Sequence, residues 1–415
     1  MSNSAGKPQI TAITQEPFLR TRMPELDSIR GIAVLLVVLF HEFGFAYGLD
    51  GLSGIRRLFV GITCVGWVGV NLFFVLSGFL ITGILLDTKS RRDYYKRFYA
   101  RRALRILPLY YAVLMLLVAL AHARLVDRHV SWAFVGLSSV YMANLTELFG
   151  VPIQYGVLWS LAVEEHFYLL WPAVVRFVSR RGIAVTGTVI SALCLGLRML
   201  TYVLGGRAGI GYTWLVADGL AMGAVLAALI RGPLGTRHGI RQIIWCSFAI
   251  SFVLLAAGAP FGIFWGRTFL GVTVRPTAIN LFFTAIIATA LRVGTSPWKA
   301  IVNPRPLRFL GDISYRIYLV HMLMFELVNH ILIRLIPSLP SGKGHFGVMV
   351  LRFSLATSIT ILIAVLSRRY FEGPFLRLKA YFEEKTDFPK NKMPSSVQRL
   401  PHPGEDLQNA LEIAQ

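Results

Sequence analysis

The sequence predicts an all-α, polytopic membrane protein with about ten transmembrane helices and both termini in the cytoplasm. Hydrophobic residues make up 55% of its 415 residues and charged residues only 15%, whereas soluble globular chains are about 45–50% apolar and 25% charged. The apolar residues fall in blocks of roughly 20, which is the length of helix that crosses a hydrocarbon core. No run alternates apolar and polar residues as the strands of an outer-membrane barrel do.

Ten apolar blocks predict spans, with ends defined to within a few residues. They are residues 28–48, 66–87, 103–123, 158–178, 183–204, 209–231, 242–260, 277–293, 308–335 and 347–371. The stretch 131–149 is apolar but short, so we expect an interfacial or re-entrant helix there. Residues 26–375 thus form the predicted transmembrane domain, preceded by a cytoplasmic segment 1–25 that lacks the apolar core of a signal peptide. Residues 376–415 are charged and contain proline, which predicts a disordered cytoplasmic tail.

The basic residues give the orientation. With the N-terminus inside, 30 of the 42 Lys and Arg residues lie on the cytoplasmic side, nine lie in outer loops and three lie within spans. This asymmetry places both termini inside. It also explains the net charge of +21 without a nucleic-acid partner, since basic loops are attracted to membrane lipid. The three cysteines, Cys64, Cys194 and Cys246, are too scattered to predict a disulfide framework or a metal site.

Ionisable side chains at three positions inside the predicted spans are candidates for function, because burying such groups in a bilayer is costly. Arg30 and His41 are eleven residues apart, which places them on one helix face about 16 Å apart along the axis, with Asp27 near the same face. Glu164 and His321 lie at a similar depth in two other spans. A single intramembrane histidine can simply bond a neighbouring helix, but three polar groups in one layer favour a site.

The segment after the second span carries eight Lys or Arg residues between Lys89 and Arg105. It can be read as a positive-inside signal that attracts anionic lipid. It can also be read as a binding site, because Arg101 and Arg105 share a helix face at i and i+4, with Arg102 beside them. Guanidinium groups in this arrangement can clamp phosphate. The second interpretation predicts a phosphate-bearing ligand at the cytoplasmic face, with its reactive end deeper in the bundle.

Five motifs, in this order, resemble the acyltransferase-3 family of integral membrane acyltransferases. They are LDSIRGIAVLLVVLFH, VNLFFVLSGFLITGILL, RRALRILPLYY, LWSLAVEEHFYLLWP and ISYRIYLVH, and the match covers most of residues 24–375. The resemblance implies a ten-helix enzyme of the bacterial inner membrane. Such an enzyme moves an acyl group, usually acetyl, from cytoplasmic acyl-CoA to a hydroxyl of an exopolysaccharide, lipopolysaccharide or other glycoconjugate. It implies no metal. Some relatives carry an extracellular SGNH-type domain, which we do not expect here.

Two positions depart from the family pattern. His166 stands where the fourth motif usually has glutamine. Val216 stands two residues before Asp218, where the family tends to have an arginine, so a substrate contact made by that arginine is in doubt.

The residue pattern and the resemblance together predict roles for the candidate residues. His41 acts as general base on the acceptor hydroxyl or forms an acyl-imidazole, and Glu164 orients the imidazole or the acceptor. Arg101, Arg102 and Arg105, with Arg30, hold the phosphates of the donor. The supporting residues are Asp27, Ser77, Glu165, Tyr168 and His321. Ser77 is not read as a nucleophile, because no G-x-S-x-G turn surrounds it.

Two other classes of protein compete with this interpretation. A proton-coupled secondary transporter of glycans or drugs would also place His and Glu inside the membrane, but the two halves of the chain show no internal repeat. A membrane glycosyltransferase would need acidic residues in the outer loops, which offer few. The sequence leaves open the acceptor, the acyl length and the oligomeric state.

Overall fold

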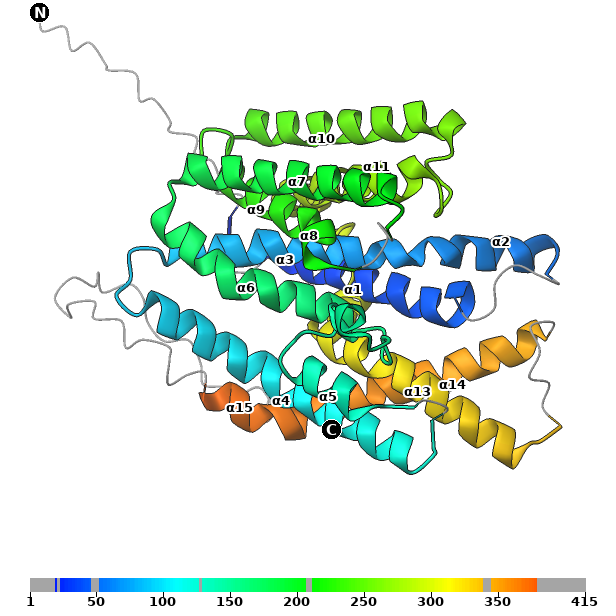
Figure 1. The fold of residues 1–415 in the computed structure, drawn as a ribbon. Coiled ribbons are helices and arrows are strands. Elements are labelled where there is room, and N and C mark those ends of the chain that lie inside the picture. Colours follow the sequence, from blue (N-terminus) through cyan, green and yellow to red (C-terminus); the bar gives the residue numbers. More distant parts are fainter. Residues whose placement is uncertain are drawn as a thin grey trace, which may run out of the picture.

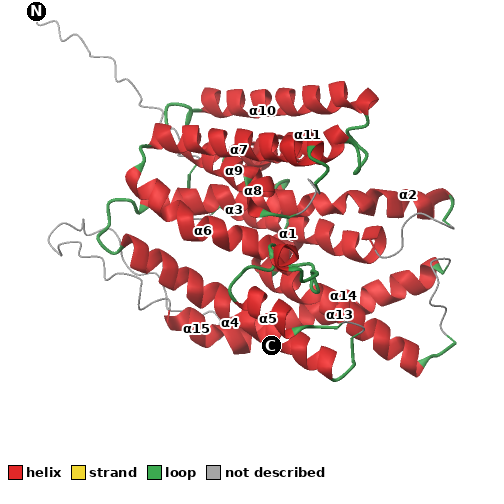
Figure 2. Ribbon diagram, in the orientation of Figure 1, coloured by secondary structure: helices red, strands yellow, loops and turns green. Residues whose placement is uncertain are grey.

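The computed structural model describes residues 19–20, 23–45, 52–126, 129–206, 211–338 and 345–378. Within these ranges the regular structure is helical and contains no strand (Figure 2). The α-helices are α1 (Pro24–Leu39), α2 (Gly54–Thr63), α3 (Val68–Asp87), α4 (Tyr94–His122), α5 (Trp132–Ser139), α6 (Leu158–Phe177), α7 (Arg180–Val203), α8 (Thr213–Val216), α9 (Asp218–Ile230), α10 (Arg237–Gly258), α11 (Phe269–Gly294), α12 (Arg305–Asp312), α13 (Ser314–Leu335), α14 (Phe346–Leu366) and α15 (Glu372–Leu378). A π-helical turn (Phe40–Phe45) extends α1.

Seven continuous helices in the described part of the chain are long and apolar enough to cross a membrane. They contain α3, α4, α7, α10, α11, α13 and α14. The predicted fold class, an all-α multi-pass membrane protein, is therefore confirmed. The other three predicted spans are also helical, as α1, α6 and α9, but α9 has only 13 residues and α6 carries two adjacent glutamates. The count of ten and the position of the termini stay predictions.

Several helix ends differ from the predicted ones. A 3-10 turn (Cys64–Trp67) joins α2 to α3 without a break, so the second helix begins at Gly54 and not near 66. Helix α4 begins at Tyr94, so most of the basic segment is helical. The short apolar stretch 131–149 holds α5 and a 3-10 turn (Thr146–Phe149). Arginine and lysine residues lower the hydropathy of the first turns of α2 and α4, so apolar blocks alone do not define where these helices begin.

Helix α3 lies at the centre of the bundle, packed against α1, α6, α9 and α11. It is apolar on all sides, which is the pattern of an enclosed helix. Close approach to α9 depends on glycine: a Cβ at Gly78 would lie 1.9 Å from the Leu220 carbonyl oxygen, and one at Gly223 would lie 2.0 Å from that of Val75. Helices α10 and α7 lie toward the outside of the bundle in Figure 1, with α4, α13 and α14 grouped on the opposite side of α3.

The predicted cytoplasmic connections meet at one end of the bundle. Arg231, after α9, pairs with Asp87 at the end of α3 (2.7 Å). Lys89 donates to the Val178 carbonyl oxygen after α6 (2.6 Å), and the Arg180 side chain donates to the carbonyl oxygen of Arg231 (2.6 Å). Figure 1 shows the α3–α4 and α9–α10 connections at the left and the α10–α11 connection at the right.

The predicted terminal segments fall mostly outside the described residues. Residues 1–18 and 21–22 of the predicted segment 1–25 are outside them, and α1 begins at Pro24. Of the predicted tail, residues 379–415 are outside them, while 376–378 complete α15. Glu372, at the start of α15, makes a buried ion pair with Arg316 of α13 at 2.5 Å.

Candidate active site

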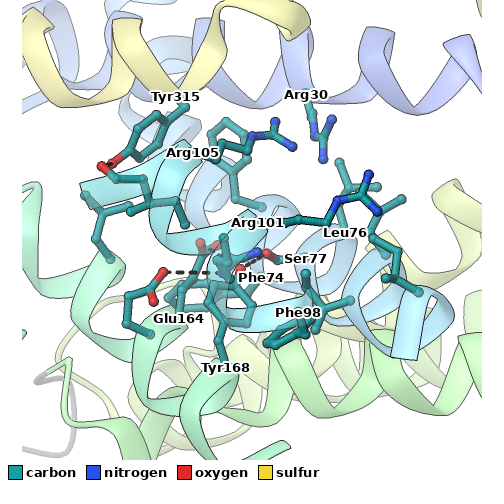
Figure 3. Close-up of a pocket in the computed structure, with 18 of the residues that line it drawn as sticks. Arg30, Phe74, Leu76, Ser77, Phe98, Arg101, Arg105, Glu164, Tyr168 and Tyr315 are labelled. Carbon is teal, nitrogen blue, oxygen red and sulfur yellow. Dashed lines mark hydrogen bonds and ion pairs between the residues drawn. The ribbon is translucent and has the colours of Figure 1, made fainter. Parts of the chain in front are cut away.

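A cavity of about 390 Å³ lies between α1, α3, α4, α6 and α13 and is lined by five arginines. Four of them, Arg97, Arg101, Arg102 and Arg105, come from α4, and Arg30 comes from α1. Figure 3 shows Arg30 and Arg105 close together, with Arg101 also facing the cavity. Only two carboxylates, Glu164 and Glu165, are among the lining residues. The excess of cationic groups suits a polyanionic ligand.

The arginines differ in their surroundings. Arg30 pairs with Asp27 at 3.3 Å. Arg102 lies 3.5 Å from a carboxylate oxygen of Glu165, and its guanidinium carbon lies 3.1 Å from the centre of the Tyr168 ring. Arg101 and Arg105 both line the cavity, which is the shared face that their spacing predicts. Arg102 is thus held against α6, whereas Arg101 and Arg105 project from one face of α4.

A hydrogen-bonded chain of side chains lines the same cavity between α3 and α6. The Tyr168 hydroxyl donates to Glu164 Oε2 at 2.9 Å, and the Ser77 hydroxyl bonds the Tyr168 hydroxyl. Figure 3 shows Ser77, Tyr168 and Glu164 together on the side of the cavity away from Arg30. Ser77 is thus in hydrogen-bonding contact with both the Tyr168 phenol and the Glu164 carboxylate.

His41 lines a second cavity of about 310 Å³. Val70, Phe74 and Tyr318 line both cavities and form the wall between them. The Tyr318 hydroxyl is fixed to the Ser160 hydroxyl at 2.5 Å. A ligand in the arginine-lined cavity and the imidazole of His41 therefore lie on opposite sides of a wall made of three side chains.

His41 and His321 are in contact, with their rings 5.1 Å apart. His321 Nδ1 lies 2.8 Å from the Tyr318 carbonyl oxygen, and His41 Nδ1 lies 2.9 Å from that of Val37. Because a carbonyl oxygen can only accept, both Nδ1 atoms carry hydrogen. His321 Nε2 is then an acceptor, and it lies 3.3 Å from His41 Nδ1. The lone pair of the His41 ring is therefore on Nε2.

The predicted polar layer is thus divided in two. His41 and His321 contact each other, and His321 is fully buried. Glu164 lines the arginine cavity, with Ser77 and Tyr168 as its neighbours, while His41 lines the other cavity. The side chain in contact with the His41 ring is thus His321, whereas Glu164, which the sequence analysis offered to orient the imidazole or the acceptor, lies in the other cavity.

The sequence missed several polar residues of the second cavity. Arg198 of α7 donates to Asp218 at 2.8 Å, and both side chains are only 1% exposed. Val216, which stands where the family tends to have an arginine, lines the same cavity as Arg198. Asp218 therefore has an arginine partner, but that arginine comes from α7. Arg198 was visible as one of three basic residues within predicted spans, but its partner is a long-range contact. At the other departure from the motif, His166 bonds the Thr213 hydroxyl at 2.7 Å.

In the described part of the chain, no group of three or more His, Cys, Asp or Glu side chains is arranged to hold a metal ion. The groups that line the two cavities include a histidine, two carboxylates and a cluster of guanidinium groups.

Comparisons with known proteins agree with the motifs. The model of the family described as "Acyltransferase domain" matches residues 23–369. The chain is 29% identical over 385 residues to "Putative peptidoglycan O-acetyltransferase YrhL" of Bacillus subtilis, covering 85% of this chain and 54% of the relative. It is 27% identical over 408 residues to "Peptidoglycan O-acetyltransferase OatA" of Listeria monocytogenes, covering 89% and 59%. The chain thus spans little more than half the length of these relatives, and no solved structure matches it. Since the family model covers most of the chain, the protein belongs to the acyltransferase family that its motifs predict.

Proposed function

We propose that the protein is a membrane O-acyltransferase that moves an acyl group, with acetyl as the expected one, from acyl-CoA to a hydroxyl of a carbohydrate. The observation that carries the proposal is the pair of cavities, one lined by five arginines and the other by His41, that share a wall. Membership of the acyltransferase family supports it, as do the names of two relatives, which are those of peptidoglycan O-acetyltransferases. The acceptor class is a surface glycan such as an exopolysaccharide, a lipopolysaccharide or another glycoconjugate.

The donor enters the arginine cavity from the end of the bundle where the basic connections meet. Its phosphates lie against Arg101 and Arg105, with Arg30 and Arg102 at the sides, because guanidinium groups bind phosphate through paired hydrogen bonds. The narrow pantetheine arm runs inward past Ser77 and Tyr168. Its thioester then reaches the wall at Tyr318, on the far side of which His41 lies.

The proposed reaction is a direct transfer that requires the wall side chains, Val70, Phe74 and Tyr318, to move apart so that the two cavities join. The acceptor hydroxyl gives its proton to His41 Nε2, and its oxygen attacks the thioester carbonyl carbon. The carbon–sulfur bond breaks, the ester forms, and the leaving thiolate takes the proton to give the free thiol of CoA. His321 and the Val37 carbonyl oxygen accept from Nδ1 and so stabilise the imidazolium while it exists. An acyl-imidazole on Nε2 is the competing covalent route.

Glu164 is proposed as a positioning residue on the donor side. Its carboxylate holds the Tyr168 hydroxyl at 2.9 Å, and Tyr168 in turn lies under the Arg102 guanidinium. The contacts between Glu164, Tyr168 and Arg102 fix the side chains along one wall of the passage that the pantetheine arm would follow. Glu165 also contacts Arg102, with its Oε1 atom 3.5 Å from Arg102 Nε.

Donor binding tests the proposal directly. Calorimetric titration of the purified protein with acetyl-CoA should show binding that Arg101→Ala or Arg105→Ala weakens. A charge-assisted bond contributes about 1.5–3 kcal/mol, so the loss should be roughly tenfold to a hundredfold. Lys89→Ala is the matched control, because Lys89 lies in the same basic segment but is bonded to the Val178 carbonyl oxygen. An equal loss of acetyl-CoA affinity in all three variants would mean that the basic segment attracts the donor only through its total positive charge, and not through a defined binding site.

Turnover separates the enzyme from the transporter. The detergent-solubilised protein, mixed with acetyl-CoA and glycan fragments, should release free CoA thiol at a rate that depends on both substrates. A secondary transporter has no thioester chemistry and would release none. Absence of both donor binding and thiol release would disprove the proposed function.

A further inference from the structure

Two arginines, Arg198 and Arg275, line the cavity that contains His41, and the proposed mechanism uses neither of them. Arg275 lies near the start of α11, and both it and His41 line this cavity. Its guanidinium donates to the Phe264 carbonyl oxygen at 2.9 Å and stacks over Trp67 at 4.9 Å from the ring centre. A Cβ added to Gly266, another lining residue, would lie 3.7 Å from Arg275 Nη2. The guanidinium is therefore held in a fixed place beside the cavity.

The two arginines of this cavity differ in charge balance. Arg198 is neutralised by Asp218 and also donates to the Thr273 and Leu215 carbonyl oxygens at 3.0 and 2.5 Å. Arg275 makes no ion pair with a carboxylate in the described part of the chain, and its buried Nε atom has no hydrogen-bond partner there. The Arg275 side chain is half-buried, and a charge that is partly removed from water without a counterion loses hydration free energy. Arg275 is thus the member of the pair that is left to bind an anion.

The other lining groups suit a sugar. Trp67, in the 3-10 turn before α3, and Trp159, in α6, line the cavity. Both side chains are partly exposed. Flat aromatic faces offer apolar surface to the carbon–hydrogen faces of a pyranose ring. The Asn71 amide, held by Asn280 at 2.9 Å, adds a polar group. Aromatic walls with a few fixed polar groups are typical of small-molecule sites.

We infer that this cavity binds the acceptor, and that the acceptor is a carbohydrate bearing an acidic group, a carboxylate or a phosphate, that pairs with Arg275 while a nearby hydroxyl faces His41. The inference rests on the proposed function, because it assigns the acceptor to the cavity that contains the proposed base. An acid group paired at one end of the cavity would fix which hydroxyl reaches the imidazole.

The test compares three tetrasaccharides that differ in one group. The first contains glucuronic acid, the second has each carboxylate reduced to a primary alcohol, and the third has those alcohols phosphorylated. Binding to the full-length protein in lipid nanodiscs is measured by calorimetry. We expect wild type to bind an acidic form at least tenfold more tightly than the neutral one, since bonds to a charged group are worth roughly tenfold to a hundredfold in affinity. The tighter of the two acidic forms identifies the carboxylate or the phosphate as the recognised group.

Three variants assign the preference to Arg275. Arg275→Gln should reduce binding of the acidic form to that of the neutral one, and Arg275→Lys should keep part of the preference. Arg267→Gln should keep all of it, because Arg267 is an exposed arginine in the connection just before α11 and does not line the cavity. Wild type that binds none of the sugars, or binds acidic and neutral forms equally, would overturn the inference, as would a preference that survives Arg275→Gln.

A parallel titration with acetyl-CoA separates this inference from the proposed function. The protein could bind acidic sugars through Arg275 and yet neither bind acetyl-CoA nor release thiol. That result would support the anion site and disprove the proposed acyltransferase function. Acetyl-CoA binding without any preference for acidic sugars would support the proposed function and disprove the anion site.

Discussion

At the scale of single residues, His41 is defined by its backbone as much as by its ring. It lies in the π-helical turn Phe40–Phe45 at the end of α1, and such turns are frequent at functional sites. Its spacing from Arg30 predicted the shared face and the depth. The spacing could not predict the contact with His321, because the two histidines are 280 positions apart in the chain and only tertiary packing brings them together.

Replacing His41 gives the first prediction. His41→Ala should reduce acyl transfer by a factor of 10²–10⁴, the usual contribution of a general base, while the protein still accumulates in the membrane. The rate of thiol release per mole of purified protein is the measurement. His122→Ala, at the exposed end of α4, serves as the control and should keep full activity. A His41→Ala protein that retains more than about a tenth of the activity would exclude His41 as the base.

The adjacent carboxylates Glu164 and Glu165 give the second prediction. Glu164→Gln should slow acyl transfer much more than Glu165→Gln, by roughly tenfold or more. Glu164 accepts from Tyr168 in the interior of the donor cavity, and the amide of glutamine would bring a competing donor into that chain. Glu165 instead pairs with Arg102 at 3.5 Å, so its replacement leaves the bond from Tyr168 to Glu164 in place. Comparing kcat of the two variants decides the question, and the opposite order would mean that the wrong acid was chosen.

At the scale of elements, the apolar blocks located the helices well but their ends poorly. Hydropathy detects the part of a helix that lies in hydrocarbon, so the amphipathic turns of α2 and the basic first turns of α4 went unrecognised. Two predicted spans are each interrupted, at Ala217 before Asp218 and at Ile313 between α12 and α13. The first interruption places Asp218 at the start of α9, where it meets Arg198. Arg198 lies on another helix, and a single sequence does not show which residues of different helices come into contact.

The contact between α3 and α9 gives the third prediction. Gly223→Ala should lower the melting temperature of the purified protein, because the new Cβ would lie 2.0 Å from the Val75 carbonyl oxygen and 2.6 Å from the Phe79 amide nitrogen. Overpacking of this kind typically costs about 1–3 kcal/mol. Gly196→Ala in α7 is the control, since a Cβ there meets nothing within 4 Å. It should melt at the same temperature or slightly higher, because alanine favours helix over glycine. Unchanged melting of Gly223→Ala would show that the two helices can separate without loss.

At the scale of the whole molecule, the two cavities follow from the way the helices meet. Helix α3 supplies Val70 and Phe74 of the dividing wall and α13 supplies Tyr318, so the wall joins two distant parts of the chain. The count of basic residues predicted that the arginine side faces the cytoplasm. The existence of a second, separate cavity was not predictable, since it depends on how side chains of α1, α3, α6, α7 and α11 fill the space between helices.

Orientation in the membrane gives the last prediction, because the proposed donor is cytoplasmic acyl-CoA and the arginine cavity must then open on that side. Single cysteines are placed in a background in which Cys64, Cys194 and Cys246 are replaced by alanine. Arg92→Cys and Lys299→Cys lie in predicted cytoplasmic connections, and Arg267→Cys lies in the predicted outer loop beside the second cavity; all three positions are exposed. In intact cells, a membrane-impermeant maleimide should label only Arg267→Cys, and after lysis it should label all three. Labelling of Arg92→Cys from outside would reverse the orientation. It would also place the five arginines on the side that acyl-CoA cannot reach, so the donor assignment would fail together with the topology.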